Sequence, residues 1–151
     1  LPGIREYTVT PGEKTTTISG KGKAGLKQEE NYYFFYLPVC YKGITGKSYA
    51  YYNTSRSKNL YLPASVDENY SYDIQLPENL TLCTPIQEKK IDNPIGSFKI
   101  TLTSEGSSLH IELALQIKKQ LITPAEYPAF RSLITEWTDR TRKPILFKTV
   151  Q

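Results

Sequence analysis

The 151-residue sequence contains no methionine, one tryptophan, one histidine and two cysteines. A zinc site with four side-chain ligands needs more cysteine and histidine than this, and so does a disulfide framework. Catalysis that uses a histidine as the base has only His110 available. The sequence therefore contains few side chains that could act in catalysis or bind a metal. We expect no metal and no other cofactor.

Long apolar runs and strong charge of one sign are also missing. No run approaches the roughly 18 residues of a membrane-spanning helix, and the first residues lack the charged and then apolar order of a signal peptide. The net charge is +4, and basic residues cluster only at Arg140, Arg142 and Lys143, where the end of a helix would favour them. We therefore expect no membrane span and no nucleic-acid partner. Because the sequence begins at Leu1 and contains no methionine, we expect either a fragment of a longer protein or a processed form.

The sequence does contain clear alternation of apolar and polar residues, above all over residues 97–118. Apolar residues at every second position flank a turn at Ser104–Ser107, and they include Leu102 and Ile111. This period of two predicts a β-hairpin with one buried face. His110 falls on the opposite, solvated face, where no pocket is expected.

Further short strands are predicted between turn signals at intervals of about 8–12 residues. The segment Tyr32–Leu37 is rich in aromatic residues and predicts a central strand that is covered on both faces. By contrast, residues 89–94 are mostly polar and predict a loop. The other predicted strands are residues 7–10, 15–19, 49–52, 60–63, 70–76, 80–82 and 145–147.

After Ile122 the apolar period changes to that of a helix. Thr123, a following proline and Glu126 have the order of a capping box, and an apolar stripe continues to Trp137. We predict a helix over residues 124–140 that packs on the sheet, although Pro128 delays its regular start. The expected fold is thus an all-β antiparallel sandwich, immunoglobulin-like or related, with one C-terminal helix, in a single domain of residues 1–151.

The cysteines and tyrosines leave alternatives open. Cys40 and Cys83 form either one disulfide or two unpaired thiols, and a catalytic thiol would need a base nearby. The chain has twelve tyrosines, and a tyrosine combines an apolar ring with a polar tip suited to sugars or peptides. The tyrosines pack in the core or form a binding surface, for which the candidates are Tyr49, Tyr51, Tyr52 and Arg56.

Several short motifs follow one another in a recognisable order. They are Arg56, Leu60–Pro63, Val66–Glu68, Tyr70–Tyr72, Leu76–Pro77, the hairpin, Ile122–Pro124, Tyr127–Arg131, Trp137 and Ile145–Lys148. Over about residues 30–151 this series resembles the C-terminal β-rich domain of uncharacterised secreted or envelope proteins of Bacteroidetes-type bacteria. In that family a domain of unknown function and a transglutaminase-like core precede the β-rich domain.

The resemblance implies a function without catalysis in this part of the protein. The family's catalytic Cys, His and Asp lie in the transglutaminase-like core, and no stretch of this chain matches them. The implied role is that of an accessory domain, which supports or positions the preceding core in the periplasm, the cell envelope or outside the cell. The alternative is a carbohydrate- or peptide-binding module that uses exposed tyrosines.

Overall fold

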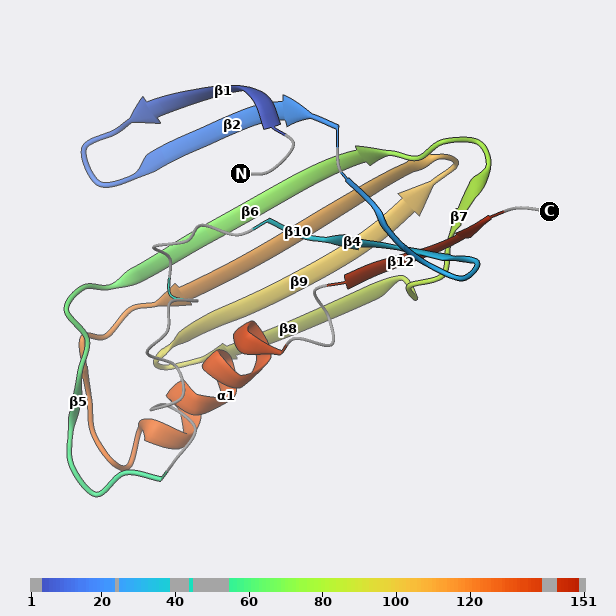
Figure 1. Ribbon diagram of the computed structural model, residues 1–151. Helices are drawn as coiled ribbons and strands as arrows, with labels where there is room; N and C mark the ends of the chain where they lie inside the picture. Colours follow the sequence, from blue (N-terminus) through green and yellow to red (C-terminus); the bar gives the residue numbers. More distant parts are fainter. Residues whose placement is uncertain (1–3, 24, 39–43, 45–54, 140–143, 150–151) are drawn as a thin grey trace.

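Figure 1 shows the computed structural model, which describes residues 4–23, 25–38, 44, 55–139 and 144–149. The predicted class is confirmed: antiparallel sheets stack with a single helix in the described part of the chain. In chain order the elements are β1 Ile4–Pro11, β2 Thr16–Gly22, β3 Lys27–Glu29, β4 Tyr32–Tyr36, β5 Leu60–Tyr61, β6 Val66–Gln75, β7 Leu80–Leu82, β8 Gln87–Asn93, β9 Gly96–Glu105, β10 Ser108–Ile117, β11 Leu121–Ile122, α1 Tyr127–Thr138 and β12 Pro144–Thr149.

The larger sheet has the strand order β6-β10-β9-β8 and contains the predicted hairpin. Glu105 pairs with Ser108 across a two-residue turn, in which Gly106 has a φ of +57°. Such tight turns require a positive φ, which glycine adopts without strain. Leu102 pairs with Ile111, and both side chains are fully buried. The alternation of the sequence therefore identified the buried face of this sheet correctly.

Two different elements cover that face (Figure 1). The helix α1 packs over one end, where Phe98 and Leu115 meet Trp137. The second sheet, of order β3-β4-β12-β7, packs over the other end, where Leu102 meets Phe147. The core is thus divided into two apolar clusters that share one sheet. The opposite face of the larger sheet carries polar side chains, which are half-buried or exposed.

The helix buries the predicted stripe but begins later than predicted. Its first residue is Tyr127, and Glu126 is the N-cap residue. One carboxylate oxygen of Glu126 accepts hydrogen bonds from the backbone N–H and the hydroxyl of Thr123, both at 3.0 Å. The predicted contact between the two residues therefore forms in a turn before the helix. The regular helix starts only where Pro128 fits, since proline is accommodated in the first turn.

Two predictions made from the sequence were wrong, one about where a strand lies and one about the burial of a strand. Residues predicted as a polar loop form β8, which pairs with β9. Along this edge strand Lys89 and Ile91 are half-buried and alternate with exposed residues, because a lysine stem can cover apolar surface while its charge stays in water.

The second error concerns β4, which was expected to be covered on both faces. Tyr33 and Phe35 pack against the core, whereas Tyr32 and Tyr36 are 44% and 55% exposed. The sheet that contains β4 is an outer layer, so only alternate side chains of the strand meet the core.

The hairpin β1–β2 stands apart from both sheets, on the side of β6 (Figure 1). Its strands pair antiparallel, with Val9 opposite Ile18 and a register shift between Ile4 and Glu6. Tyr7, Val9 and Ile18 lie on one face of the hairpin and are 71%, 48% and 57% exposed. From Glu6 onward each side chain of the hairpin is exposed. This hairpin therefore has an apolar face that nothing in the described chain covers.

Candidate functional site

His110 lies where the sequence predicted, on the open face of the larger sheet, and its partners are charged. Its Nδ1 is 2.7 Å from Oδ1 of Asp73 on β6, and its Nε2 is 3.5 Å from Oε1 of Glu112. Glu112 in turn accepts a hydrogen bond of 2.7 Å from Lys99 on β9. The hydrogen bond with Asp73 raises the pKa of His110. Within residues 55–139, no serine, threonine or cysteine hydrogen-bonds to this ring, so His110 joins a surface ion-pair network there.

The two cysteines give no support to a catalytic pair with His110. Cys83 is half-buried and follows β7 in the second sheet, where its backbone N–H donates to the carbonyl of Leu146 at 2.7 Å. His110 lies on the open face of the other sheet, so the structure does not bring Cys83 and His110 together. Cys40 lies outside the described residues, and its pairing with Cys83 stays a prediction. No cluster of His, Cys, Asp or Glu among the described residues could hold a metal ion.

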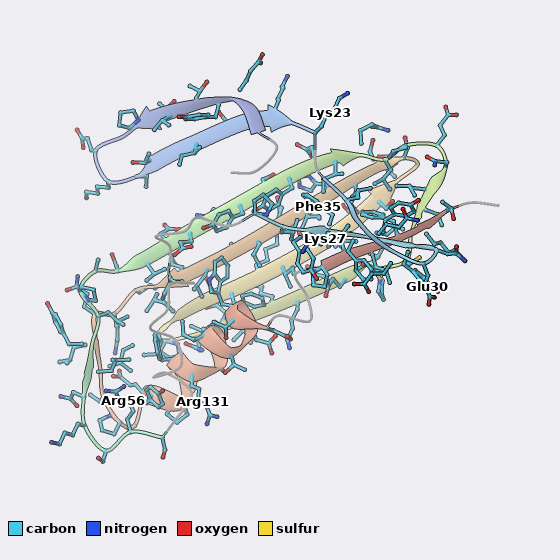
Figure 2. The ribbon with its side chains drawn as sticks, in the orientation of Figure 1. Lys23, Lys27, Glu30, Phe35, Arg56 and Arg131 are labelled. Atoms are coloured by element: carbon cyan, nitrogen blue, oxygen red, sulfur yellow. The ribbon has the colours of Figure 1, made fainter. Side chains whose placement is uncertain are left out.

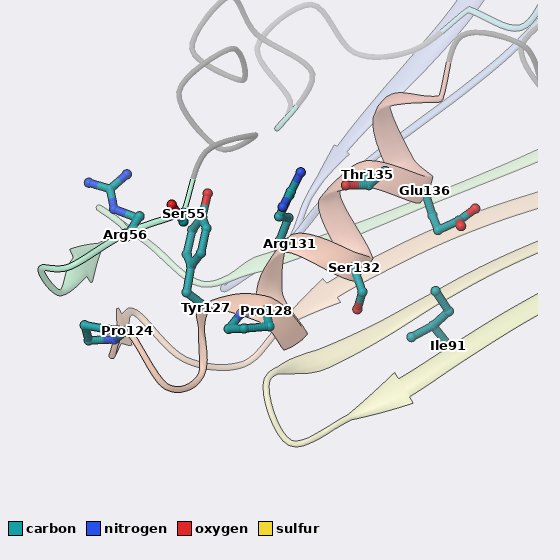
Figure 3. Close-up of a pocket in the computed structure, with 10 residues that line it drawn as sticks. All are labelled: Ser55, Arg56, Ile91, Pro124, Tyr127, Pro128, Arg131, Ser132, Thr135 and Glu136. Atoms are coloured by element: carbon teal, nitrogen blue, oxygen red, sulfur yellow. The ribbon is translucent and has the colours of Figure 1, made fainter.

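A cleft of about 490 Å³ runs along α1 from Tyr127 to Glu136 (Figure 3). Its lining comes from the segment before β5, from β8, from the turn before α1 and from α1 itself. Arg56, a candidate binding residue, belongs to this lining. The other residues that matter below are Ile91, Pro124, Tyr127, Pro128, Arg131 and Glu136.

The position of α1 beside the cleft is set by Asn93, at the end of β8. The side-chain oxygen of Asn93 accepts hydrogen bonds from the backbone N–H groups of Ile95 and Gly96, at 2.9 and 3.3 Å. Its side-chain nitrogen donates to the carbonyl of Ala129 at 3.1 Å. One asparagine thus holds both the β8–β9 turn and the first turn of the helix. This attachment joins β8 to α1, and both elements line the cleft.

Two arginines flank the ring of Tyr127 in the cleft (Figure 3). The guanidinium carbon of Arg56 lies 5.9 Å from the ring centroid, within the range of a cation–π contact. Arg131 is exposed and comes four residues after Tyr127, so the two residues are neighbours one turn apart along α1. Tyr127 itself is only 3% exposed and forms the floor. Within the described chain, neither guanidinium forms an ion pair.

The carboxylates near the cleft are already engaged with lysines. Oε1 of Glu136 lies 2.5 Å from Nζ of Lys89, and the side chain of Glu136 is 19% exposed. Glu126 forms an ion pair with Lys119. The hydrogen bond from Lys119, with those from Thr123, lowers the pKa of Glu126 to about 2. Both carboxylates are therefore compensated by lysines and leave the positive charge of the two arginines in place.

The predicted tyrosine surface cannot be placed, because Tyr49, Tyr51 and Tyr52 lie outside the described residues. The described tyrosines give a different surface, on the outer face of β4. Tyr32 and Tyr36 are exposed there, and Nζ of Lys27 lies 5.6 Å from the ring centroid of Tyr36. Figure 2 shows that Lys27 belongs to the second sheet, whereas Arg56 and Arg131 lie at the α1 end of the molecule.

Sequence reasoning identified Arg56 but missed the rest of the cleft. Tyr127 belongs to the buried stripe of the helix, whereas Arg131 is exposed. Their four-residue step was the available signal that they lie side by side. Nothing local to Arg56 indicates that it meets Tyr127, because the two residues are far apart in the chain.

In the part of the chain that the structure describes, no helix is long and apolar enough to span a membrane. In sequence, the chain matches no curated protein. It is similar to a crystal structure from Parabacteroides distasonis ATCC 8503, whose protein is described as a putative protease. The two share 31% sequence identity with a TM-score of 0.68, over 81% of this chain and 24% of that chain. This chain therefore spans about a quarter of the length of the similar protein, which comes from a Bacteroidetes species.

Residues 31–147 match the model of a protein family, and this range runs from just before β4 into β12. It contains the larger sheet, the helix and the cleft, and it leaves out the hairpin β1–β2. The family is described as a domain of unknown function with a solved structure, DUF3858. The chain belongs to this family.

Proposed function

We propose that this domain is a non-catalytic accessory module of a longer secreted or envelope protein, in which it supports or positions a preceding transglutaminase-like core. The similar protein from Parabacteroides supports the first part of this proposal, because its chain is about four times as long as the region that matches. The transglutaminase-like core is what the order of motifs in the sequence implies.

The hairpin β1–β2 is the observation that carries the proposal. An isolated two-stranded hairpin is at best marginally stable in water. This one presents Tyr7, Val9 and Ile18 on a single face, and the family match begins only after it. Exposed apolar side chains that lie together mark a contact surface. We therefore expect this face of β1–β2 to pack on the preceding core and to attach the module to it.

The absence of catalysis is supported by the surroundings of His110 and Cys83. A nucleophile needs a base within hydrogen-bond reach. His110 is occupied by Asp73 and Glu112, and Cys83 lies in the other sheet. Replacing these two residues with alanine should leave the activity of the longer protein unchanged, whereas a loss of activity with an intact fold would reject the non-catalytic role.

Hydrogen exchange on two proteins tests the attachment. The first is the 151-residue chain, and the second also carries the residues that precede it in the source gene. We expect amides of β1–β2 to exchange rapidly in the first protein and slowly in the second, because packing on the core suppresses opening. In the longer protein, Val9→Ser with Ile18→Ser should restore rapid exchange, whereas Thr8→Ser on the polar face should not. Equal exchange in both proteins would contradict the proposal.

The outer face of β4 favours a second candidate function, that of a peptide- or carbohydrate-binding module. Tyr32 and Tyr36 project from the same side of the strand, and Lys27 lies over the ring of Tyr36. Rings in this arrangement suit contact with a sugar or a peptide. Titration of the isolated chain with soluble glycans should shift the resonances of both tyrosines if this function holds, and Tyr36→Ala should weaken the binding. No change in either resonance with any glycan or peptide tested would remove this candidate.

A further inference from the structure

The cleft beside α1 contains two cations that have no counter-charge within the described chain. Arg56 is half-buried and lies against the ring of Tyr127, and Arg131 stands on the other side of that ring (Figure 3). A charged group that is partly removed from water is stabilised when an opposite charge meets it. The cleft is therefore complementary to an anion.

The surrounding groups do not supply that anion. Glu136, at the far end of the cleft, is held by Lys89 at 2.5 Å. The cleft and its immediate surroundings therefore contain one carboxylate, that of Glu136, and three cations, which are Arg56, Arg131 and Lys89. Glu126 is engaged with Lys119. Two positive charges are thus left for a ligand.

We infer that the cleft binds the carboxylate of an acidic side chain presented by a peptide. A guanidinium donates two parallel hydrogen bonds to a carboxylate, which gives geometric as well as charge selectivity. This ligand class is not part of the accessory role proposed above. The cleft lies within residues 31–147, whereas the proposed attachment uses β1–β2, so the two surfaces are separate.

The remaining lining fits a peptide better than a sugar acid. Ile91, Pro124 and Pro128 provide apolar surface for the neighbours of an acidic residue. A volume of about 490 Å³ is larger than one carboxylate needs and falls within the usual range of ligand pockets, about 300–1,000 Å³. Sugars stack on exposed aromatic faces, but Tyr127 is 3% exposed and its ring is covered on one side by Arg56.

The test is a titration of the isotope-labelled 151-residue chain, followed by NMR. The probe is a short acetylated and amidated peptide that carries two glutamates between leucines, and its control has glutamines in their place. We expect saturable shifts at the amides of the first two turns of α1 with the glutamate peptide only. Added salt should weaken the binding, because partly exposed charges are screened.

Matched variants distinguish binding in the cleft from nonspecific attraction of the peptide to a basic surface. Arg131→Gln and Arg56→Gln should each weaken binding about tenfold, which is the size expected for loss of a charged hydrogen bond. Lys58→Gln removes the same charge from an exposed residue outside the cleft and should leave binding unchanged. Because Arg131 is exposed, its replacement should leave the unfolding temperature unchanged, and this measurement shows that the fold persists.

Three outcomes would overturn the inference. Equal binding of the glutamine peptide would mean that the cleft selects apolar contacts. An equal loss with Lys58→Gln would mean that the net charge of the surface attracts the peptide. If an oligogalacturonate produced the shifts at α1 and the glutamate peptide did not, the ligand would be an acidic sugar.

Discussion

Two antiparallel hairpins of this protein follow the same local rule in different surroundings. In β9–β10 one face is apolar, and its Leu102 and Ile111 are fully buried under the second sheet. In β1–β2 one face is also apolar, but its Tyr7 and Ile18 are 71% and 57% exposed. Alternation of apolar and polar residues therefore indicates which face of a hairpin is available for packing. It does not indicate whether a partner for that face lies in the same chain.

The difference has an energetic consequence. Burial of a large aliphatic side chain stabilises a fold by about 1.5–3 kcal/mol. The strands β9 and β10 receive this stabilisation from α1 and from the second sheet, whereas β1 and β2 receive none from the described chain. The two hairpins should therefore differ most in their response to truncation of an apolar side chain.

The largest expected effect is on Ile111. Ile111→Ala should lower the free energy of unfolding by about 2–5 kcal/mol, because the side chain is fully buried and leaves a cavity. The matched control is Ile18→Ala, which should change the free energy of unfolding of the 151-residue chain by less than about 0.5 kcal/mol. Urea unfolding followed by tryptophan fluorescence measures both, because Trp137 lies in the core. A similar loss in the two variants would show that β1–β2 is part of the cooperative fold.

The next largest difference is expected when a glycine of each hairpin is replaced with alanine. A Cβ at Gly96 would lie 1.8 Å from the carbonyl oxygen of Gln116 on the partner strand, so Gly96→Ala should destabilise the chain by at least about 1–3 kcal/mol. A Cβ at Gly12 would lie 3.0 Å from the carbonyl oxygen of Thr15, in a turn that is exposed. Thermal unfolding should detect a large decrease for Gly96→Ala only. An unchanged melting temperature for Gly96→Ala would mean that the backbone relaxes easily there.

Limited proteolysis should separate the hairpins without any mutation. Lys21 and Lys23 are exposed at the end of β2, whereas Lys99 lies half-buried inside the larger sheet. Trypsin should cut first after Lys21 or Lys23, because cleavage requires local opening and β1–β2 opens most easily. The remaining fragment should keep its melting temperature, as determined after mass spectrometry identifies the cut. Early cleavage after Lys99 would contradict this order.

The smallest expected effect concerns pH and the open face of β10. The hydrogen bond with Asp73 raises the pKa of His110 above its usual value of 6.5. The stability that this pairing contributes is therefore present below about pH 6.5 and is lost as pH rises through the folded-state pKa. NMR titration of the imidazole should give a value above 6.5, and Asp73→Asn should lower it. If the pKa of His110 were unchanged in the Asp73→Asn variant, Glu112 would be the residue that raises it.

Much of the fold was predictable because it follows local periodicity. The hairpin of residues 97–118, the stripe that ends at Trp137 and the polar position of His110 all follow from periods of two and of 3.6. The edge strand β8 was missed because its inward side chains are mostly polar. Tyr32 and Tyr36 were assigned to the core because their apolar character does not reveal that their sheet is an outer layer.

The candidate site was predictable only in part. Arg56 stood out in the sequence, but Tyr127 and Arg131 gained a functional role only from their position beside it. The sequence by itself determined the secondary structure of β9, β10 and α1 and the faces that they bury, because these depend on neighbours within a few residues. Only the tertiary structure decided that α1 and a second sheet share one face, that nothing in the described chain covers β1–β2 and that two arginines meet at one cleft. Each of these depends on contacts between residues distant in the chain, which no local pattern specifies.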